Sequence, residues 1–334
     1  MGYRADLPEP TLVDSTSVRV RIHSAALNHL DLFVVEGLPG VTIRPPWVLG
    51  ADGAGVVDAV GAEVRDIAVG DRVVINPGLS DRTCEYCRAG EHSLCPRFRL
   101  MGEHVSGTIA ELVVLPSANV RRLRADVSFD EAAACGLVGL TAWRMLVSRA
   151  RVMPDEDVLI WGIGGGVALA ALRIAKSLGA RVWVTSGSDA KLERAAALGA
   201  DVCLNHRTAD VPAEIRSRTT KRGMNVVVDS VGQATWARSL GALGRGGRLV
   251  TCGATSGPAL EIDARRLFWN QWTVMGSTMG NDHEFDAIVQ ELGLGRLRVP
   301  IDSTFPIAEG RAALQRLASD DHFGKVVIRV IEDP

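Results

Sequence analysis

A glycine-rich turn at 162–166 joins a short apolar segment, 157–161, to an apolar helical pattern over 167–178. A strand that feeds such a turn lets the backbone approach a pyrophosphate closely, and the helix behind it presents N–H groups and its positive dipole end. Read strictly, the pattern is G-x-x-G-x-x-A, from Gly162 through Gly165 to Ala168. It predicts dinucleotide binding, and the alternative is a tight turn without a ligand. The residues assigned to the cofactor here are Gly162, Gly164, Gly165, Gly166 and Val167.

Beyond residue 155 the sequence alternates between strand and helix patterns. Apolar strand patterns recur at 181–185, 202–204, 225–229, 248–252 and 273–276, and helical patterns at 191–198 and 234–243. Repeated β-α units predict an α/β fold with a doubly wound parallel sheet, the Rossmann arrangement. The first 130 residues instead show short strands between turns, such as the alternating Val18–Ile22, and predict a β-rich domain. A length of 334 residues fits two domains.

The charge balance and the apolar segments exclude several classes of partner. Lys and Arg number 37 against 39 Asp and Glu, so the chain lacks the basic excess that nucleic-acid binding needs. The longest uncharged apolar run, 158–172, is rich in glycine and too short to span a bilayer. No basic flank precedes an apolar segment at the N-terminus, so no signal peptide is expected. We therefore expect a cytoplasmic protein with no nucleic-acid or membrane partner.

The end of the second predicted strand of the Rossmann sheet carries Ser186 and no carboxylate. In NAD-binding proteins an Asp or Glu is expected about 20 residues beyond the glycines, where it binds the ribose. Without that negative charge a 2′-phosphate is not repelled, and Ser186, Ser188 and Lys191 can bind it. The nearby Asp189 is expected to lie at the N-terminus of the next helix, where its charge is favourable. The sequence therefore favours NADP over NAD.

Three of the six cysteines fall within one short segment with the spacing Asp81-x₂-Cys84-x₂-Cys87-x₇-Cys95. Zinc prefers four tetrahedral ligands, and short thiolate spacings on one loop supply them locally. Because all four ligands of such a site come from the protein, the site would be closed and structural. The pattern predicts one structural zinc, and the alternative is three incidental reduced thiols.

Motifs over nearly the whole length resemble one enzyme superfamily. They lie at 26–31, 46–55, 69–73, 102–104, 139–143, 276–280 and 323–327, in addition to the cysteine segment and the glycine turn. With these motifs the chain resembles the medium-chain dehydrogenase/reductase superfamily, in its zinc-containing alcohol dehydrogenase-like and quinone oxidoreductase-like branch. The resemblance implies a GroES-like β-rich catalytic domain at 1–130 and 281–334, with a metal lobe at 81–95, and a Rossmann cofactor-binding domain at 131–280. It also implies a small-molecule substrate and a homodimer or homotetramer.

The departures from the family pattern concern its metals. By alignment, the ligand positions of the family's catalytic zinc hold Asn28, Ala51 and Leu137 here, and none of these side chains is a thiolate or an imidazole. An Asn at the first position is typical of the quinone oxidoreductase-like branch. Cys135 and Asp52 lie close in sequence to the lost positions, and would serve as displaced ligands if a catalytic zinc were kept. In the structural lobe, Asp81 stands where the family has a cysteine.

The resemblance also implies roles for single residues. The wall that holds the nicotinamide and its carboxamide corresponds to Thr141, Cys252, Gly253, Ala254 and Thr278. The catalytic candidates are Asn28, as a hydrogen-bond donor, and Asp31, which either acts as a base or orders its own loop. The leading hypothesis is an NADP-dependent oxidoreductase that reduces quinones or activated alkenes by direct hydride transfer without catalytic zinc. The alternatives are a zinc-dependent alcohol dehydrogenase with displaced ligands, and an NADPH-binding structural or regulatory protein without turnover.

Overall fold

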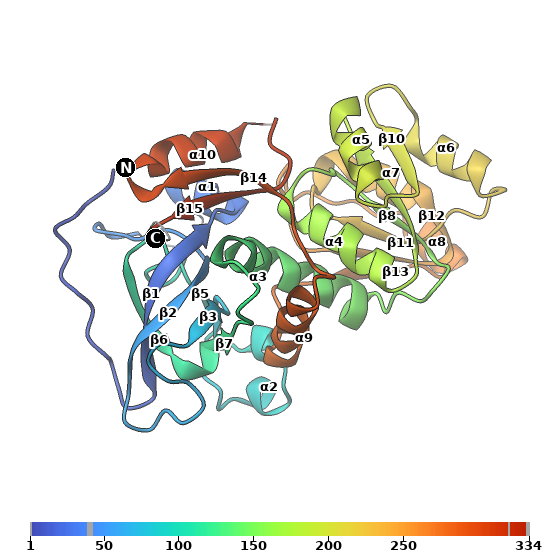
Figure 1. Cartoon of the computed structure of the whole chain (residues 1–334). Coiled ribbons are helices and arrows are strands. Elements are labelled where there is room, and N and C mark those ends of the chain that lie inside the picture. The colour runs from blue at the N-terminus through green and yellow to red at the C-terminus, as the bar shows by residue number, and fades with distance from the viewer. Residues whose placement is uncertain (1, 39–42, 320, 332–334) are drawn as a thin grey trace. The chain divides into compact units, whose positions relative to one another are not determined.

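The computed structural model describes residues 2–38, 43–319 and 321–331, and the chain divides into two compact units (Figure 1). The first unit contains residues 1–140 and 280–334, and the second contains residues 141–279. The division falls within helix α3 (Phe129–Trp143), whereas the boundary expected from the sequence, after residue 130, lies near the start of that helix.

The first unit is built on a seven-stranded sheet with β1 (Ser17–Ala26) at its centre. Strand β1 pairs antiparallel with β2 (Asp52–Val60), β6 (Leu112–Pro116) and β15 (Lys325–Arg329). The sheet is completed by β3 (Arg72–Ile75), β7 (Val120–Arg122) and β14 (Ile301–Pro306), and a separate pair is formed by β4 (Gly78–Leu79) and β5 (Arg99–Leu100). Val18, Val20 and Ile22 are fully buried, as the alternating pattern predicted. The C-terminal strands therefore complete the sheet that the N-terminal residues begin.

Helices of the first unit pack beside this sheet and position its polar residues. The unit contains α1 (His29–Glu36), α2 (Glu85–Arg88), α9 (Asp282–Gly293) and α10 (Gly310–Ala318), besides most of α3. Apolar side chains of α10, among them Leu314 and Leu317, pack with Val326 and Ile328 of β15 in one buried cluster. This packing fixes the start of β15, where Lys325 lies, beside the N-terminal end of α1.

The second unit is a six-stranded parallel sheet in the order β10-β9-β8-β11-β12-β13. The strands are β8 (Asp157–Ile160), β9 (Arg181–Ser186), β10 (Val202–Asn205), β11 (Met224–Asp229), β12 (Leu243–Thr251) and β13 (Thr273–Gly276). The helices between them are α4 (Gly166–Ser177), α5 (Asp189–Ala197), α6 (Val211–Arg218), α7 (Gln233–Ala242) and α8 (Ala264–Asn270). The expected α/β class and Rossmann sheet are confirmed. Three details differ from the expectation. Strand β12 begins at Leu243 rather than Arg248, and helices α6 and α8 were not expected.

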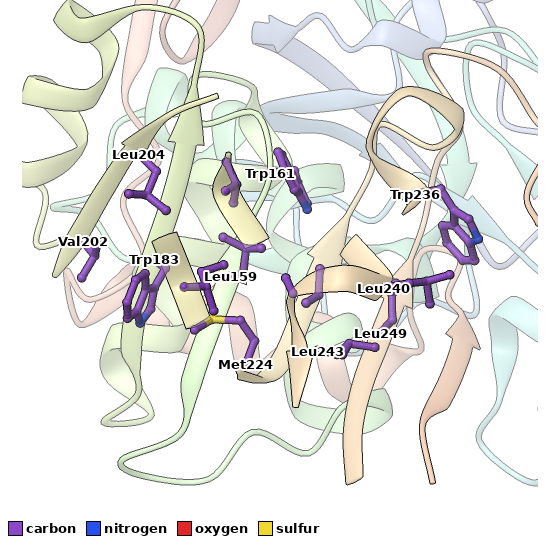
Figure 2. Close-up of a cluster of buried hydrophobic side chains, with 14 of the residues drawn as sticks. Leu159, Trp161, Trp183, Val202, Leu204, Met224, Trp236, Leu240, Leu243 and Leu249 are labelled. Atoms are coloured by element: carbon purple, nitrogen blue, oxygen red, sulfur yellow. The ribbon is translucent and has the colours of Figure 1, made fainter. Parts of the chain in front are cut away.

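A tryptophan-rich core holds the second unit together (Figure 2). Trp161 and Trp183 are almost fully buried against leucines of the central strands. Burial of such side chains contributes roughly 25 cal/mol for each Å² of apolar surface removed from water. This core fixes the strands whose carboxyl ends carry the predicted cofactor residues. Within the described residues, no helix is both long and apolar enough to cross a membrane.

Candidate functional site

The glycine turn of the second unit has the backbone that a pyrophosphate site needs. Gly162 and Gly164 adopt φ values of +68° and +134°, which favour glycine, and Gly165 is the N-cap of α4. A Cβ on Gly165 would meet nothing within 4 Å, so the space in front of the helix is open. The turn is fixed to the neighbouring strand, since the Ile163 N–H donates to the Thr185 carbonyl at 2.8 Å. The helix N-terminus can therefore receive a diphosphate.

Residues at the end of β9 form the predicted ribose end of the site. The Ser188 N–H donates to the Ser186 hydroxyl oxygen at 3.1 Å, which orders the loop before α5. The Asp189 carboxylate accepts a hydrogen bond from the Asn205 amide at 2.7 Å and lies in the first turn of α5. The Asp189 carboxylate therefore already has a hydrogen-bond partner in Asn205. Lys191 follows in the same helical turn.

A basic residue that the sequence analysis missed also reaches this loop. A Cβ placed on Gly187 would lie 2.6 Å from Nε of Arg207, so the guanidinium packs directly over the loop. Arg207 follows β10, which pairs in parallel with β9 so that Asn205 is opposite Ser186. The order of strands in the sheet could have indicated this neighbour, because residues after adjacent parallel strands emerge at the same edge.

Of the residues assigned to the nicotinamide, Thr141 lies in helix α3, and the other four follow other strands of the same sheet. Cys252, Gly253 and Ala254 come directly after β12, and Thr278 comes just after β13. Since all strands are parallel, these segments share the carboxyl edge with the glycine turn. Burial raises the pKa of the Cys252 thiol to about 12, and Asp229 adds to the effect, so this cysteine stays protonated. The ligand-binding edge of a doubly wound sheet is this one.

The predicted metal lobe of the first unit brings its four residues together. One ligand atom from each of Asp81, Cys84, Cys87 and Cys95 lies within 4.8 Å of all the others. Among the described residues, this is the one group of three or more His, Cys, Asp or Glu side chains that could hold a metal. A zinc ion with Zn–S bonds of about 2.3 Å fits a cluster of this size. The chain therefore carries a zinc site of structural type.

Hydrogen bonds in the lobe prepare its anionic ligands. The N–H groups of Cys84 and Thr83 both donate to one Asp81 oxygen at 2.9 Å and hold the pKa of that carboxyl well below its usual range. Burial opposes ionisation of Cys95, but N–H groups of Asp81 and Arg97 donate to its sulfur and lower its pKa. Burial raises the pKa of Cys87 to about 11 when no metal is bound. Binding zinc must therefore displace a proton from Cys87.

Asn28, the first catalytic candidate, is the N-cap residue of α1, and its side chain is buried. Its amide oxygen accepts a hydrogen bond from Nζ of Lys325 at 2.6 Å, and its Nδ2 donates to Asp52 at 2.9 Å. Lys325 also donates to Asp52 at 3.0 Å. We call these three side chains the buried triad. The sequence predicts roles for Asn28 and Asp52, but none for Lys325.

Asp31, the second catalytic candidate, is occupied by backbone groups. One carboxylate oxygen accepts from the Asn28 N–H at 2.8 Å and the other from the Gly50 N–H at 2.9 Å. Complete burial raises the pKa of this carboxyl to about 6, against the opposing effect of the two hydrogen bonds. The contacts order the loop at the start of α1, which is one of the two roles expected from the sequence. The role as a base stays a prediction.

The displaced-ligand alternative depends on Cys135 and Asp52. Burial, with the nearby Asp52 charge, raises the pKa of the Cys135 thiol to about 12, which disfavours the thiolate that zinc requires. Both oxygens of Asp52 already accept hydrogen bonds, from the Leu137 N–H at 2.6 Å and from Asn28 and Lys325. The donors around Asn28, Ala51 and Leu137 therefore do not fit a catalytic zinc.

A parallel sheet with a glycine turn at its carboxyl edge, and a GroES-like unit with a thiolate-rich metal lobe, define an oxidoreductase that uses a nicotinamide cofactor. Comparison with known families agrees. Residues 14–125 match the alcohol dehydrogenase GroES-like domain, and residues 166–293 match the zinc-binding dehydrogenase family. The chain belongs to the medium-chain zinc-containing alcohol dehydrogenase family.

Some relatives are named alcohol dehydrogenases, and one is named a quinone oxidoreductase. An NAD-dependent alcohol dehydrogenase of Saccharolobus solfataricus is 30% identical over 320 residues, which cover 93% of this chain and 92% of the relative. A crystal structure titled as an NAD-dependent alcohol dehydrogenase is 44% identical with a TM-score of 0.94, covering 98% of this chain and 95% of the other. A human quinone oxidoreductase is 26% identical over 313 residues, covering 92% of this chain and 86% of its own length. The expected family is confirmed.

Proposed function

We propose that this protein is an NADPH-dependent oxidoreductase that reduces quinones or activated alkenes by direct hydride transfer without a catalytic metal. The observation that carries the proposal is the donor set at Asn28, Ala51 and Leu137. A zinc ion that acts as a Lewis acid needs thiolate, imidazole or carboxylate ligands and an open position. Here Ala51 and Leu137 offer hydrocarbon side chains, and the Asn28 amide is bonded to Lys325 and Asp52.

The chemistry of a conjugated acceptor fits such a site. When bound, a reduced nicotinamide would supply a hydride, which a conjugated acceptor would take at a carbon remote from its oxygen. The negative charge then spreads over an enolate or a hydroquinone anion, which needs less stabilisation than a simple alkoxide. The Asn28 Nδ2 has two N–H donors, and its contact with the Ala26 carbonyl, at 3.4 Å, is longer than its bond to Asp52, at 2.9 Å, so the more weakly engaged donor is the one we assign to a substrate oxygen. The protein then contributes orientation and a donor, while solvent supplies the proton.

The choice of NADP rests on the loop after β9. Ser186 and Ser188 offer hydroxyl groups, Lys191 and Arg207 offer positive charge, and Asp189 is bonded to Asn205. A 2′-phosphate is bound well by such charge-assisted donors. Relatives named NAD-dependent favour the other cofactor, so both cofactors belong in every assay.

A second function, oxidation of alcohols, is favoured by the names of the relatives. The nicotinamide cofactor and the structural zinc lobe are common to both functions, and the difference lies in the chemistry around Asn28. A substrate panel separates the two. We expect NADPH oxidation with quinones and enones, persisting after brief chelation too mild to strip the zinc lobe, and poor turnover of simple alcohols and aldehydes. Background rates with every quinone and enone, or efficient chelator-sensitive oxidation of a plain alcohol, would reject the proposal.

Replacing Lys191 by alanine is expected to weaken NADPH binding by about 1–2 kcal/mol, the loss of one charge-assisted bond, and to leave NADH binding nearly unchanged. Arg207→Ala should act in the same direction. The matched control is Lys221→Ala, because Lys221 is an exposed lysine in the turn between α6 and β11. Fluorescence titration with both cofactors makes the measurement, and equal affinity of the wild type for NADPH and NADH would contradict the assignment.

We also propose a homodimer or homotetramer in the cytoplasm. Strand β13 is the outer strand of its sheet, and the neighbouring helix α8 exposes Phe268 and Trp269 by 67% and 68%. Edge strands and exposed aromatic side chains favour pairing with a second copy. The six cysteines are free thiols, and a thiolate metal lobe suits a reducing compartment. Light scattering after gel filtration gives the mass, and a monomer at micromolar concentration would overturn the assembly.

A further inference from the structure

The buried triad contains a lysine almost without contact with water. Lys325 is 3% exposed and Asp52 is fully buried. Unpaired charges at such depth are very costly, so the ammonium and the carboxylate must stabilise each other. Lys325 comes from the first residue of β15 and Asp52 from the first residue of β2, and β1 lies between these two strands.

All three positions that correspond to the family's catalytic zinc ligands converge on Asp52. Asn28 reaches it through its amide at 2.9 Å, Leu137 through its backbone N–H at 2.6 Å, and Ala51 precedes it in the chain. The backbone is shaped for this contact, because a Cβ on Gly136 would lie 2.5 Å from an Asp52 oxygen. The residues at the three positions that correspond to the family's zinc ligands therefore surround the Asp52 carboxylate, which is already paired with the Lys325 ammonium.

The charges around the triad leave no role for a second cation. Asp52 balances Lys325, the Asp31 carboxylate accepts two backbone N–H groups, and Cys135 stays a neutral thiol. A divalent metal would need several anionic donors with free lone pairs. To bind here, it would have to displace Lys325 and leave the ammonium buried without a partner.

We propose that Lys325 is the resident cation of this site and takes the place of the catalytic metal by acting through Asn28. The ammonium bonds to the amide oxygen, which polarises the amide and makes its N–H a stronger donor to an anionic oxygen. Lys325 is therefore a positioning residue, and Asn28 is the group that meets the substrate. This inference rests on the proposed metal-free reduction and adds the residue that makes it work.

The test is a charge-neutral double variant, Lys325→Met with Asp52→Asn, which removes the cation without leaving a buried unpaired charge. The matched control is Lys176→Met with Asp201→Asn, the same change in the half-exposed ion pair of the second unit, whose atoms lie 2.8 Å apart. With the substrate that the wild type turns over best, we expect kcat of the triad variant to fall at least about tenfold. Its KM and its Kd for NADPH should stay within about threefold of the wild-type values. The control should keep all three constants.

A triad variant that folds and keeps the wild-type kcat would overturn the role of Lys325, while the reductase proposal would stand. A wild type that reduces neither quinones nor enones would instead reject the reductase proposal.

A measurement on the wild type decides the inference even if the triad variant does not fold. Cobalt(II) is added to the zinc-containing protein, and bound zinc plus cobalt is counted after dialysis. We expect a single metal ion per chain, because Lys325 blocks the second position. A second ion per chain in the wild type, absent when Cys135→Ser is introduced, would show that the site takes a metal and would overturn the inference.

Discussion

Replacing Cys84 by serine is expected to abolish zinc binding and to lower the free energy of unfolding by at least about 3 kcal/mol, because binding free energy at a closed metal site is folding free energy. The four ligand atoms lie within 4.8 Å of one another, and removing one thiolate leaves three ligands where a closed structural zinc site takes four. The lobe is tied to the rest of its unit by an ion pair of 2.7 Å between Arg82 and Asp282, so its loss should reach helix α9. Zinc analysis and thermal unfolding measure both effects.

The control for this prediction is Cys203→Ser, which makes the same change outside the lobe. Cys203 is a free thiol whose sulfur contacts the Leu192 carbonyl at 3.5 Å. We expect it to keep full zinc content and to change stability by less than about 1 kcal/mol. A Cys84→Ser protein with wild-type zinc content and melting temperature would refute the assignment of the lobe.

Replacing Lys325 alone by methionine is expected to cost about 3–5 kcal/mol of stability, since it leaves the Asp52 carboxylate buried without its cation. Lys176→Met, which breaks a half-exposed pair with Asp201, should cost no more than about 1 kcal/mol. Denaturant unfolding of the two variants beside the wild type makes the comparison.

The double change Lys325→Met with Asp52→Asn should recover much of the stability lost in Lys325→Met, because neither charge is then left alone. Equal losses for Lys325→Met and Lys176→Met would contradict the prediction, and so would a double variant less stable than the single one. The unfolding measurements and the kinetic measurements on the triad variants test different claims. Unfolding free energies test the ion pair between Lys325 and Asp52, and kcat tests the effect of that pair on Asn28.

Local signals in the sequence predict most of the fold, the glycine turn and the metal lobe. The signal for the glycine turn is local in sequence, because Gly162 and Gly164 directly follow a strand and helix α4 begins immediately after them. The metal lobe is also local, because four ligands within 81–95 need no distant partner to meet. In both cases the residues of the site are close in sequence, so the sequence alone predicts that they lie close together in the structure.

The buried triad could not be predicted in the same way. Lys325 and Asp52 are 273 residues apart in the chain, and only the pairing of β15 and β2 with β1 brings them together. Arg207 was missed for a related reason, because its contact with the loop at Gly187 depends on the order of strands in the sheet. Side chains that meet through sheet topology leave no periodic signal in the sequence.

The number of zinc ions per chain, measured together with substrate preference on the same preparation, tests the metal-free mechanism most directly. A metal-free mechanism predicts a single zinc per chain, held by the lobe at 81–95, in a protein that oxidises NADPH with a quinone or an enone. Two zinc ions per chain, with alcohol oxidation that is lost when the second ion is removed and regained when it is returned, would contradict it.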